Sequence, residues 1–347
     1  MRQLPKRSAL TAAALILLAS LMIGLGWWWH TKDLANNKPI RAEPSACALP
    51  AEAASALHPG MVWVPAGRYT PGDTTYPEEV SKGKVSVKGF WMDSTEVSND
   101  AFAAFVKATG YVTVAERPVN QKLHPGLPSD MQQPGAVVFI IPKNLSAKEN
   151  ISQWWQYIPG ANWRHPGGPA TTIEGRGSFP VVAVTPEDAL AYAKWRGHTM
   201  PSESEWEWAA REAQDKPSVE HAQPAQANTW QGLFPIINSA ADGFVGLAPV
   251  GCYPANALGL FDMIGNVWEL TTDAWSDTRP DASAVHPDQL PPNLRAAASD
   301  RQVIKGGSFL CAPDYCMRYR AGSRQPQEVD LGASHLGFRT ILVAKGP

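Results

Sequence analysis

The sequence predicts a loop-rich α+β domain, on the strength of its composition and of a few short periodic segments. The chain has 347 residues, among them 31 Pro, 28 Gly and 14 Trp. Because Pro interrupts helices and central strands, this composition does not suit a helical bundle or a regular βαβ array. The formal net charge is −2 with no basic stripe, which argues against a nucleic-acid-binding protein. We expect aromatic side chains to fill the space between irregular segments.

Two strands are predicted at the start of the globular part. Residues 61–69 alternate weakly between apolar and polar side chains and end at the turn residues Pro71, Gly72 and Asp73. Residues 85–92 form a second candidate strand, with Val85 and Val87 at alternating positions. Each segment is read as one continuous strand.

Three helices follow from apolar spacing and from residues that begin or end helices. They are expected over residues 96–109, 186–195 and 202–212. The first has Ser98 or Asn99 as its N-cap and Gly110 as its stop. The second begins with a Pro, the third with a capping box of Ser202 and Glu205. Residues 116–178 show little periodicity, and such a long irregular stretch is often functional.

The N-terminus has the pattern of a targeting segment. Arg2, Lys6 and Arg7 precede an uncharged run, Ser8–Trp29, that is long enough to span a bilayer as a helix. Its terminal tryptophans favour the membrane interface, so an uncleaved signal anchor is preferred to a cleaved signal peptide or a buried helix. The basic flank places the remaining chain outside the cytoplasm, on the periplasmic side of the inner membrane, or secreted if cleavage occurs. The expected organisation is a signal anchor or signal peptide over 1–32, a linker over 33–57 and one domain over 58–347.

The four cysteines are Cys47, Cys252, Cys311 and Cys316. Disulfides are the default in an oxidising compartment, and Cys47 could pair with Cys252, although nothing local in the sequence supports that pairing. From the residues alone, Cys311 and Cys316 are better explained as a disulfide than as a clasp for a soft metal ion. The scattered His residues fit no metal-ligand spacing.

Two further segments combine carboxylate or amide side chains with Gly-containing turns. They run over residues 228–244 and 262–269. Calcium takes six to eight hard oxygen ligands, which such side chains and exposed carbonyls supply. The alternative is ordinary turn chemistry, in which Asp and Asn side chains bond their own backbone.

The order of several motifs resembles the formylglycine-generating enzymes, also called sulfatase-modifying factors. The resemblance covers about residues 58–343, and the paired cysteines are its specific part, since generic landmarks also occur in non-catalytic relatives. Its landmarks are Gly60-Met-Val-Trp-Val-Pro-Ala-Gly67, Phe90-Trp-Met-Asp-Ser-Thr-Glu-Val-Ser-Asn99, Asn162-Trp-Arg-His-Pro-Gly-Gly168, Pro180-Val-Val-Ala-Val184, Met200-Pro-Ser-Glu-Ser-Glu-Trp-Glu207, Gly265-Asn-Val-Trp-Glu269, Gly306-Gly-Ser-Phe-Leu-Cys311, Tyr315-Cys-Met-Arg-Tyr-Arg320 and Gly332-Ala-Ser-His-Leu-Gly-Phe-Arg339.

The resemblance implies a variant of the C-type-lectin fold with little regular secondary structure. It implies an enzyme that oxidises a cysteine in a Cys-x-Pro-x-Arg-like segment of a sulfatase to formylglycine, using O₂ and Cu(I). Cys311 and Cys316 would hold the copper, the substrate thiolate would be a third sulfur ligand, Ser308 would supply an active-site hydroxyl, and Trp268 would form an aromatic wall.

The resemblance also implies two calcium sites and marks one departure from the family. One set of ligands would be Asn228, the Thr229 carbonyl, Asp242 and the Phe244 carbonyl. The other would be Asp262, the Gly265 and Val267 carbonyls and Glu269. His335 stands where the family usually has Asn beside the active site, and imidazole can ionise or ligate copper.

Other functions remain open from the sequence. One alternative is an exported maturation factor that modifies a different substrate. Another is a non-catalytic lectin-like binding module in which Cys311 and Cys316 form a disulfide. An iron-dependent sulfoxide synthase would need a His-rich iron site, which is not visible in the sequence.

Overall fold

The computed structural model describes residues 47, 58–119, 126–143, 150–216, 223–279, 300–343 and 346–347. The chain divides into two units, Met1–Ser45 and Ala46–Pro347, and all described residues belong to the second. The predicted signal anchor lies outside the described residues, as does most of the predicted linker. Within the described ranges, no helix combines the length and the apolar character needed to cross a membrane.

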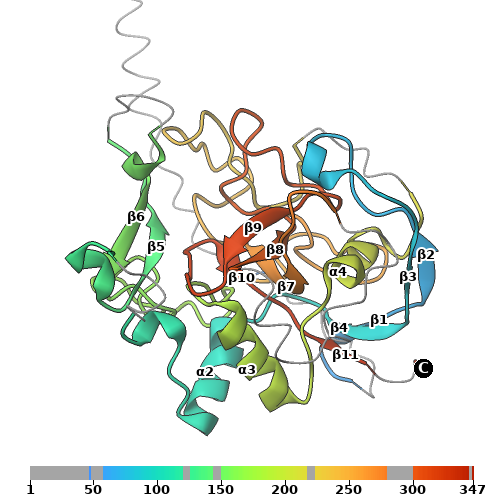
Figure 1. The fold of residues 1–347 in the computed structure, drawn as a ribbon, viewed down its shortest axis with the longest axis horizontal. Helices are drawn as coiled ribbons and strands as arrows, with labels where there is room; N and C mark the ends of the chain where they lie inside the picture. The colour runs from blue at the N-terminus through green and yellow to red at the C-terminus, as the bar shows by residue number, and fades with distance from the viewer. Residues whose placement is uncertain are drawn as a thin grey trace, which may run out of the picture. The chain divides into compact units, whose positions relative to one another are not determined.

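The predicted α+β class is confirmed, and each of the three predicted helices is present (Figure 1). They are α2 (Asn99–Thr109), α3 (Pro186–Arg196) and α4 (Glu203–Ala210). The Ser98 side chain caps α2 by accepting from the Ala101 amide, and Gly110 ends it in the left-handed conformation. The helix begins three residues later than predicted because Val97 and Ser98 are extended and bonded to other segments.

In the part of the chain that the structure describes, short strands form four small sheets, consistent with the loop-rich prediction. The largest has the order β10-β7-β8-β9, with β10 parallel to β7 and the other pairs antiparallel. In Figure 1 this sheet occupies the middle of the domain, with α3 packed against β7 and α2 packed against α3. Its strands are β7 (Trp268–Ala274), β8 (Arg301–Lys305), β9 (Gln325–Glu328) and β10 (Leu336–Gly337).

The two strands predicted near the start of the domain are wrong in their continuity, because each divides between two sheets. The first becomes β1 (Met61–Val64) and β2 (Gly67–Tyr69), and the second becomes β3 (Val85–Val87) and β4 (Phe90–Asp93). β4 pairs with β1 on one side and with β11 (Ile341–Leu342) on the other, whereas β2 and β3 pair with each other. Pro65 has no amide to continue the first ladder. At Gly89, between β3 and β4, a Cβ atom would lie 2.4 Å from the Trp63 ring, so a side chain would not fit there.

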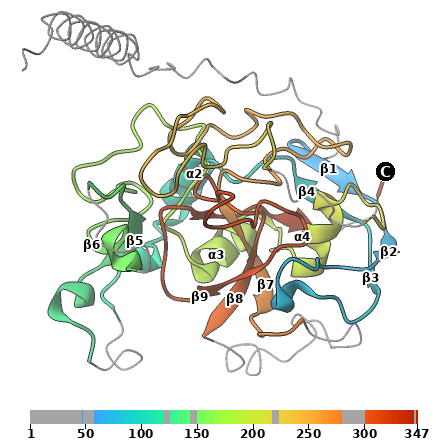
Figure 2. The same cartoon turned by 90° about the horizontal axis from the view of Figure 1, so that it is seen from above.

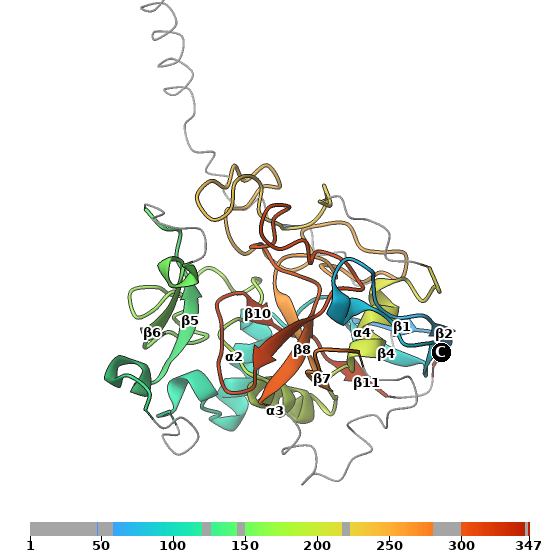
Figure 3. The ribbon, with the colours of Figure 1, turned by 45° about the horizontal axis from the view of Figure 1, so that its top comes forward.

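The stretch predicted to be irregular, 116–178, contains a hairpin that the sequence did not reveal. Strands β5 (Gly135–Phe139) and β6 (Trp155–Pro159) pair antiparallel, and Figures 2 and 3 show them together at one side of the domain. Short 3₁₀ helices among the described residues are η1 (Pro77–Glu79), η2 (Val114–Glu116), η3 (Ser129–Gln132) and η4 (Ile151–Gln153).

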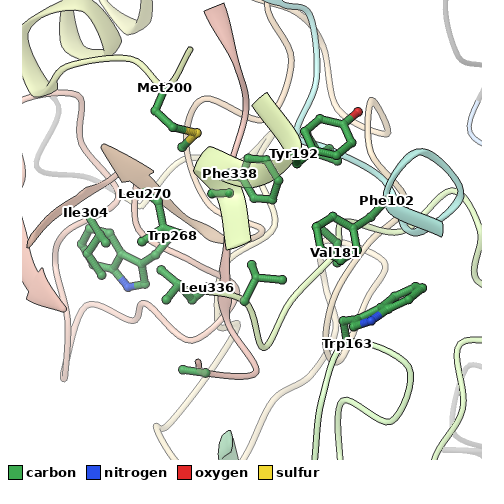
Figure 4. Packing of buried hydrophobic residues seen from close by; sticks show 14 of the residues in the cluster. Phe102, Trp163, Val181, Tyr192, Met200, Trp268, Leu270, Ile304, Leu336 and Phe338 are labelled. Carbon is green, nitrogen blue, oxygen red and sulfur yellow. The ribbon is translucent and has the colours of Figure 1, made fainter. Parts of the chain in front are cut away.

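The main core lies between the central sheet and helices α2 and α3 (Figure 4). Phe102 from α2 makes edge-to-face contacts with Trp163 and Phe338, and Trp268 contributes its ring from β7. Cys311 is buried in this same cluster, so the core extends to the candidate site. Cys47 and Cys252 form a disulfide, the pairing that the sequence left open.

Candidate active site

The loop that carries both remaining cysteines begins at a double-glycine turn after β8. Gly306 and Gly307 have φ angles of +91° and +77°, which side chains rarely adopt. A Cβ atom on Gly307 would lie 2.9 Å from the carbonyl oxygen of Arg318. The two glycines therefore allow the chain to leave the sheet and return closely against its own later segment. The Gly-Gly-Ser motif thus serves to place the cysteine loop.

Cys311 and Cys316 face each other across this loop as free thiols. Their Sγ atoms are 2.7 Å apart, and the contact is a hydrogen bond between two unlinked sulfurs. One turn holds the pair, because the Cys316 amide donates to the Ala312 carbonyl at 2.9 Å. Cys311 is 1 % exposed, and Cys316 is partly buried. The structure thus brings together the two residues on which the sequence argument depended.

The two thiols have different electrostatic surroundings. The hydrogen bond from Cys311 lowers the pKa of Cys316, and the Arg318 backbone amide and the charges of Arg318 and Arg320 act in the same direction. Burial raises the pKa of Cys311 well above its ordinary value, and the Cys316 sulfur adds to that rise. Cys316 is therefore the sulfur that ionises first, with Cys311 as its hydrogen-bond donor.

Ser308 and Trp268 are two further predicted site residues, one within this loop and the other in the core cluster that contains Cys311. Ser308 is fully buried, its carbonyl accepts from the Cys311 amide at 2.9 Å, and its hydroxyl accepts from the Leu310 amide at 3.3 Å. Trp268 is 2 % exposed and shares the core cluster with Cys311. Ser308 therefore stabilises the conformation of the cysteine loop through its carbonyl and hydroxyl oxygens. Trp268 contributes a buried aromatic ring.

An aromatic cluster beside the cysteines was not assigned a role from the sequence. The Tyr315 ring stacks on Phe234 with centroids 4.0 Å apart and planes 9° apart. It also meets Trp154 edge to face at 6.4 Å. Tyr315 is 45 % exposed although its neighbour Cys316 is partly buried. Trp154 comes from the unperiodic stretch, and only the general link between long loops and function pointed to it.

His335 reaches the same region from the segment before β10. Its backbone carbonyl accepts from the Trp268 amide at 2.9 Å, and its ring lies 4.6 Å from the Trp155 ring. The side chain is buried, and its Nδ1 atom has no hydrogen-bond partner in the described part of the chain. Burial lowers the pKa of His335 to about 3. The imidazole is therefore neutral, and its basic nitrogen is available beside the aromatic cluster.

The first predicted calcium set is brought together around Asp242. Its carboxylate accepts from the Thr229 amide at 3.0 Å and from the Phe244 amide at 3.2 Å. The Asn228 side chain lies in the same loop cluster and donates to the Gly246 carbonyl. Burial raises the pKa of Asp242, which leaves a partly desolvated carboxyl in need of a counter-charge. This donor set is compatible with a hard cation, whose ligands are oxygens.

The second predicted calcium set is arranged differently. Glu269 holds Arg339 through both carboxylate oxygens, each at 2.7 Å, so its charge is already paired. Asp262 accepts from the Gly251 amide, and burial raises its pKa to about 6. Within the described ranges, no group of three or more His, Cys, Asp or Glu side chains is placed to hold a metal ion. The Glu269 carboxylate as seen here does not fit a calcium ligand.

Comparison with known proteins gives consistent matches along the domain. A family model described as "Sulfatase-modifying factor enzyme 1-like domain" matches residues 47–344. The formylglycine-generating enzyme of Mycobacterium tuberculosis is 44 % identical over 298 residues, which cover 81 % of this chain and 97 % of that protein. The matched region therefore includes the whole described domain except its last residues.

Two other similarities bear on the site and on the fold. A mouse protein named "Inactive C-alpha-formylglycine-generating enzyme 2" is 35 % identical over 306 residues, covering 84 % of this chain and 88 % of that protein. The structure of PvdO from Pseudomonas aeruginosa matches with a TM-score of 0.54 and 22 % identity, covering 81 % of this chain and 93 % of that one. The PvdO likeness supports the fold alone.

Proposed function

The chain belongs to the sulfatase-modifying factor family of formylglycine-generating enzymes, and we propose that it oxidises a sulfatase cysteine to formylglycine with Cu(I) and O₂. The observation that carries the proposal is the pair of free thiols, Cys311 and Cys316, 2.7 Å apart at the end of a constrained loop. Sulfur ligands select soft ions such as Cu(I), so the donor set fits that ion.

We assign a different role in the reaction to each of the residues at this site. Cys316 supplies the thiolate, because its pKa is lowered, and Cys311 supplies a neighbouring sulfur held in place by its own hydrogen bonds. When bound, Cu(I) supplies a Lewis acid that lowers the pKa of a client thiol and a centre that reacts with O₂. Trp268 and the buried Ser308 exclude water from the inner side of the pair.

The proposed reaction is a two-electron oxidation of the client cysteine. Conversion of a cysteine CH₂–SH group to an aldehyde takes up one water and releases sulfide, two protons and two electrons, and O₂ is the proposed electron acceptor. A client segment would approach past Tyr315, which is the exposed member of the aromatic cluster beside Cys316. His335 would be neutral during this reaction, so it can accept a hydrogen bond from the client.

Calcium is proposed as a structural ion at the Asp242 cluster. That carboxyl is partly desolvated and accepts from backbone amides, so a hard cation bound there would supply the missing counter-charge. The Asp262 set is proposed as a second site only if Glu269 exchanges Arg339 for the ion. A direct titration with calcium separates one site from two.

We further propose that the protein works outside the cytoplasm, held at the periplasmic side of the inner membrane by its N-terminal segment, or secreted if that segment is cleaved. The Cys47–Cys252 disulfide supports this, because structural disulfides persist mainly in oxidising compartments. Fractionation of cells that express the full chain, followed by protease treatment of the outer face, tests this placement.

The activity is tested with a synthetic peptide that contains a Cys-x-Pro-x-Arg segment. The full-length protein loaded with Cu(I) should form a peptide aldehyde detectable by mass spectrometry, and Cys311→Ser and Cys316→Ser should each abolish it. Ser323→Ala is a control for changing a buried hydroxyl-bearing side chain elsewhere. Absence of aldehyde from wild-type protein that binds Cu(I) would instead favour a different client or a binding role.

A further inference from the structure

A short segment near the start of the domain forms ion pairs and a cation–π contact with arginines that follow Cys316. Helix η1 and the residue before it, Tyr76, lie against Arg318 and Arg320. The Arg320 guanidinium binds both carboxylate oxygens of Glu79, at 3.0 and 2.9 Å. Arg318 binds Glu78 at 2.6 Å and Glu79 at 3.4 Å. Glu79 thus holds two arginines that stand two and four residues after one cysteine of the pair.

Glu79 has the burial expected of a fixed structural contact. It is 0 % exposed, and Arg320 is 2 % exposed. Arg320 is also paired with Asp73 at 2.5 Å, and its Nε atom donates back to the Met317 carbonyl at 2.8 Å. Removing one partner of a buried ion pair leaves an uncompensated charge, which is strongly unfavourable. The guanidinium is therefore held in one orientation over the 316–320 backbone.

The second arginine connects this contact to the thiols. The backbone amide of Arg318 lowers the pKa of both sulfurs, Cys311 and Cys316. The Arg318 side chain is held outside the loop by Glu78, Glu79 and the Tyr76 ring. The Tyr76 ring centroid is 4.1 Å from the guanidinium carbon, a cation–π distance. The direction of the Arg318 amide is thereby linked to a segment more than two hundred residues earlier in the chain.

We propose that Glu79 is a positioning residue for the thiol pair, because it fixes the guanidinium groups of Arg318 and Arg320, and Arg320 in turn holds the carbonyl of Met317, the residue next to Cys316. This inference rests on the proposed role of Cys311 and Cys316 as the copper-binding pair. Groups that orient a metal ligand from outside commonly change metal affinity or activity by about 10- to 100-fold when they are replaced. Glu79 does not need to touch copper or client to have that effect.

The test is the Cu(I) affinity of full-length Glu79→Gln, measured by competition with a chromogenic Cu(I) chelator. Gln has one acceptor oxygen and no charge, so it cannot hold both arginines, and the affinity should fall by about tenfold or more. Turnover of the motif peptide should fall through kcat with KM little changed, because the client-facing surface is intact. Glu79→Asp, which keeps the charge, should recover part of the affinity.

Two controls separate positioning from simple destabilisation. Glu78→Gln removes one partner of Arg318 but leaves Arg320 bound to Glu79, so it should lower the Cu(I) affinity less than Glu79→Gln does. Asp188→Asn removes a buried carboxylate that caps α3, and it should lower the stability while leaving the Cu(I) affinity unchanged.

The outcomes distinguish this inference from the proposed function. If wild-type protein fails to bind Cu(I) through its cysteines, the proposed function fails first. If wild-type binds and Glu79→Gln binds equally well, the positioning role is overturned. An equal loss of affinity in Asp188→Asn also overturns it, since any destabilising change would then act alike.

Discussion

The imidazole of His335 lies on the indole of Trp155 with ring centroids 4.6 Å apart and planes inclined by 44°. This contact keeps the ring away from water, and burial lowers the pKa of His335 to about 3. The lowered value means that the folded protein holds this group neutral at pH values where the unfolded chain would protonate it. The folded state therefore loses stability as the solution becomes acidic.

The first prediction follows from the sign of that shift. A base whose pKa falls on folding contributes its full stability above its ordinary value near 6.5, and that contribution is lost as the pH falls below it. At pH 5, wild-type protein should have lost about 2 kcal/mol from this group alone. His335→Asn should not show this loss, as measured by urea unfolding at pH 5 and pH 8. Parallel pH profiles for the two proteins would contradict the burial argument.

A second prediction concerns the unequal thiols. Cys311→Ala removes the hydrogen-bond donor and should raise the pKa of Cys316, because that bond is the main cause of its lowering. The matched variant is Cys316→Ala, in which burial should keep the pKa of Cys311 high. Thiolate absorbance followed against pH should therefore show Cys316 ionising below Cys311 when each is alone. The reverse order would mean that the loop does not distinguish the two sulfurs.

A third prediction separates calcium binding from a merely buried acid at Asp262. Burial raises the pKa of its carboxyl to about 6, so this group favours the folded state at low pH and loses that contribution as pH rises from about 4 to 6. In calcium-free buffer at pH 8, Asp262→Asn should therefore stabilise the protein by up to about 3 kcal/mol. The backbone φ of 53° at this position is one that Asn tolerates well.

If calcium binds at Asp262, adding the ion should make wild-type protein more stable than Asp262→Asn, the opposite of the order expected without calcium. Wild-type protein would then gain thermal stability on calcium addition, and Asp262→Asn would gain less. Asp242→Asn is the matched variant for the other candidate site. Equal calcium stabilisation in wild type and Asp262→Asn, with loss in Asp242→Asn, would leave the Asp242 cluster as the site.

A fourth prediction concerns the Cys47–Cys252 disulfide, which joins residues 205 positions apart in the sequence. A cross-link over so long a segment restricts the unfolded chain, so Cys47→Ser with Cys252→Ser should lower the free energy of unfolding by about 2–4 kcal/mol. Urea denaturation measures this change. Dithiothreitol should produce the same loss in wild-type protein and none in the double variant, and a reductant effect on the variant would point to another disulfide.

The sequence predicted the parts of this fold that depend on local chemistry. The Ser98 cap, the Ser202–Glu205 capping box and the terminal Gly110 of α2 depend on neighbours within a few residues, so they can be read directly. The β5–β6 hairpin could not, because Trp155 packs on Phe139 and on His335, far along the chain. The split of the early strands also depends on a distant partner, β11.

The candidate site divides in the same way. Cys311 and Cys316 are close in sequence, and the family motif identified them as a pair. In the structure both are free thiols, whereas the residues alone favoured a disulfide. The sequence near Glu79 does not indicate its proposed role, because its partners, Arg318 and Arg320, lie near the other end of the sequence. Long-range ion pairs of this kind leave no periodic pattern to detect.

The position of strand β11 in the sequence determines when the core can form during synthesis of the chain. β11 closes the open side of β4, and Arg339, just before it, supplies the counter-charge for the buried Glu269. A growing chain that still has these residues inside the ribosome has an unpaired strand and a carboxylate that cannot be buried. The core is therefore completed only once residues 339–342 have left the ribosome, and a chain cut before them would lack both the closing strand and the counter-charge.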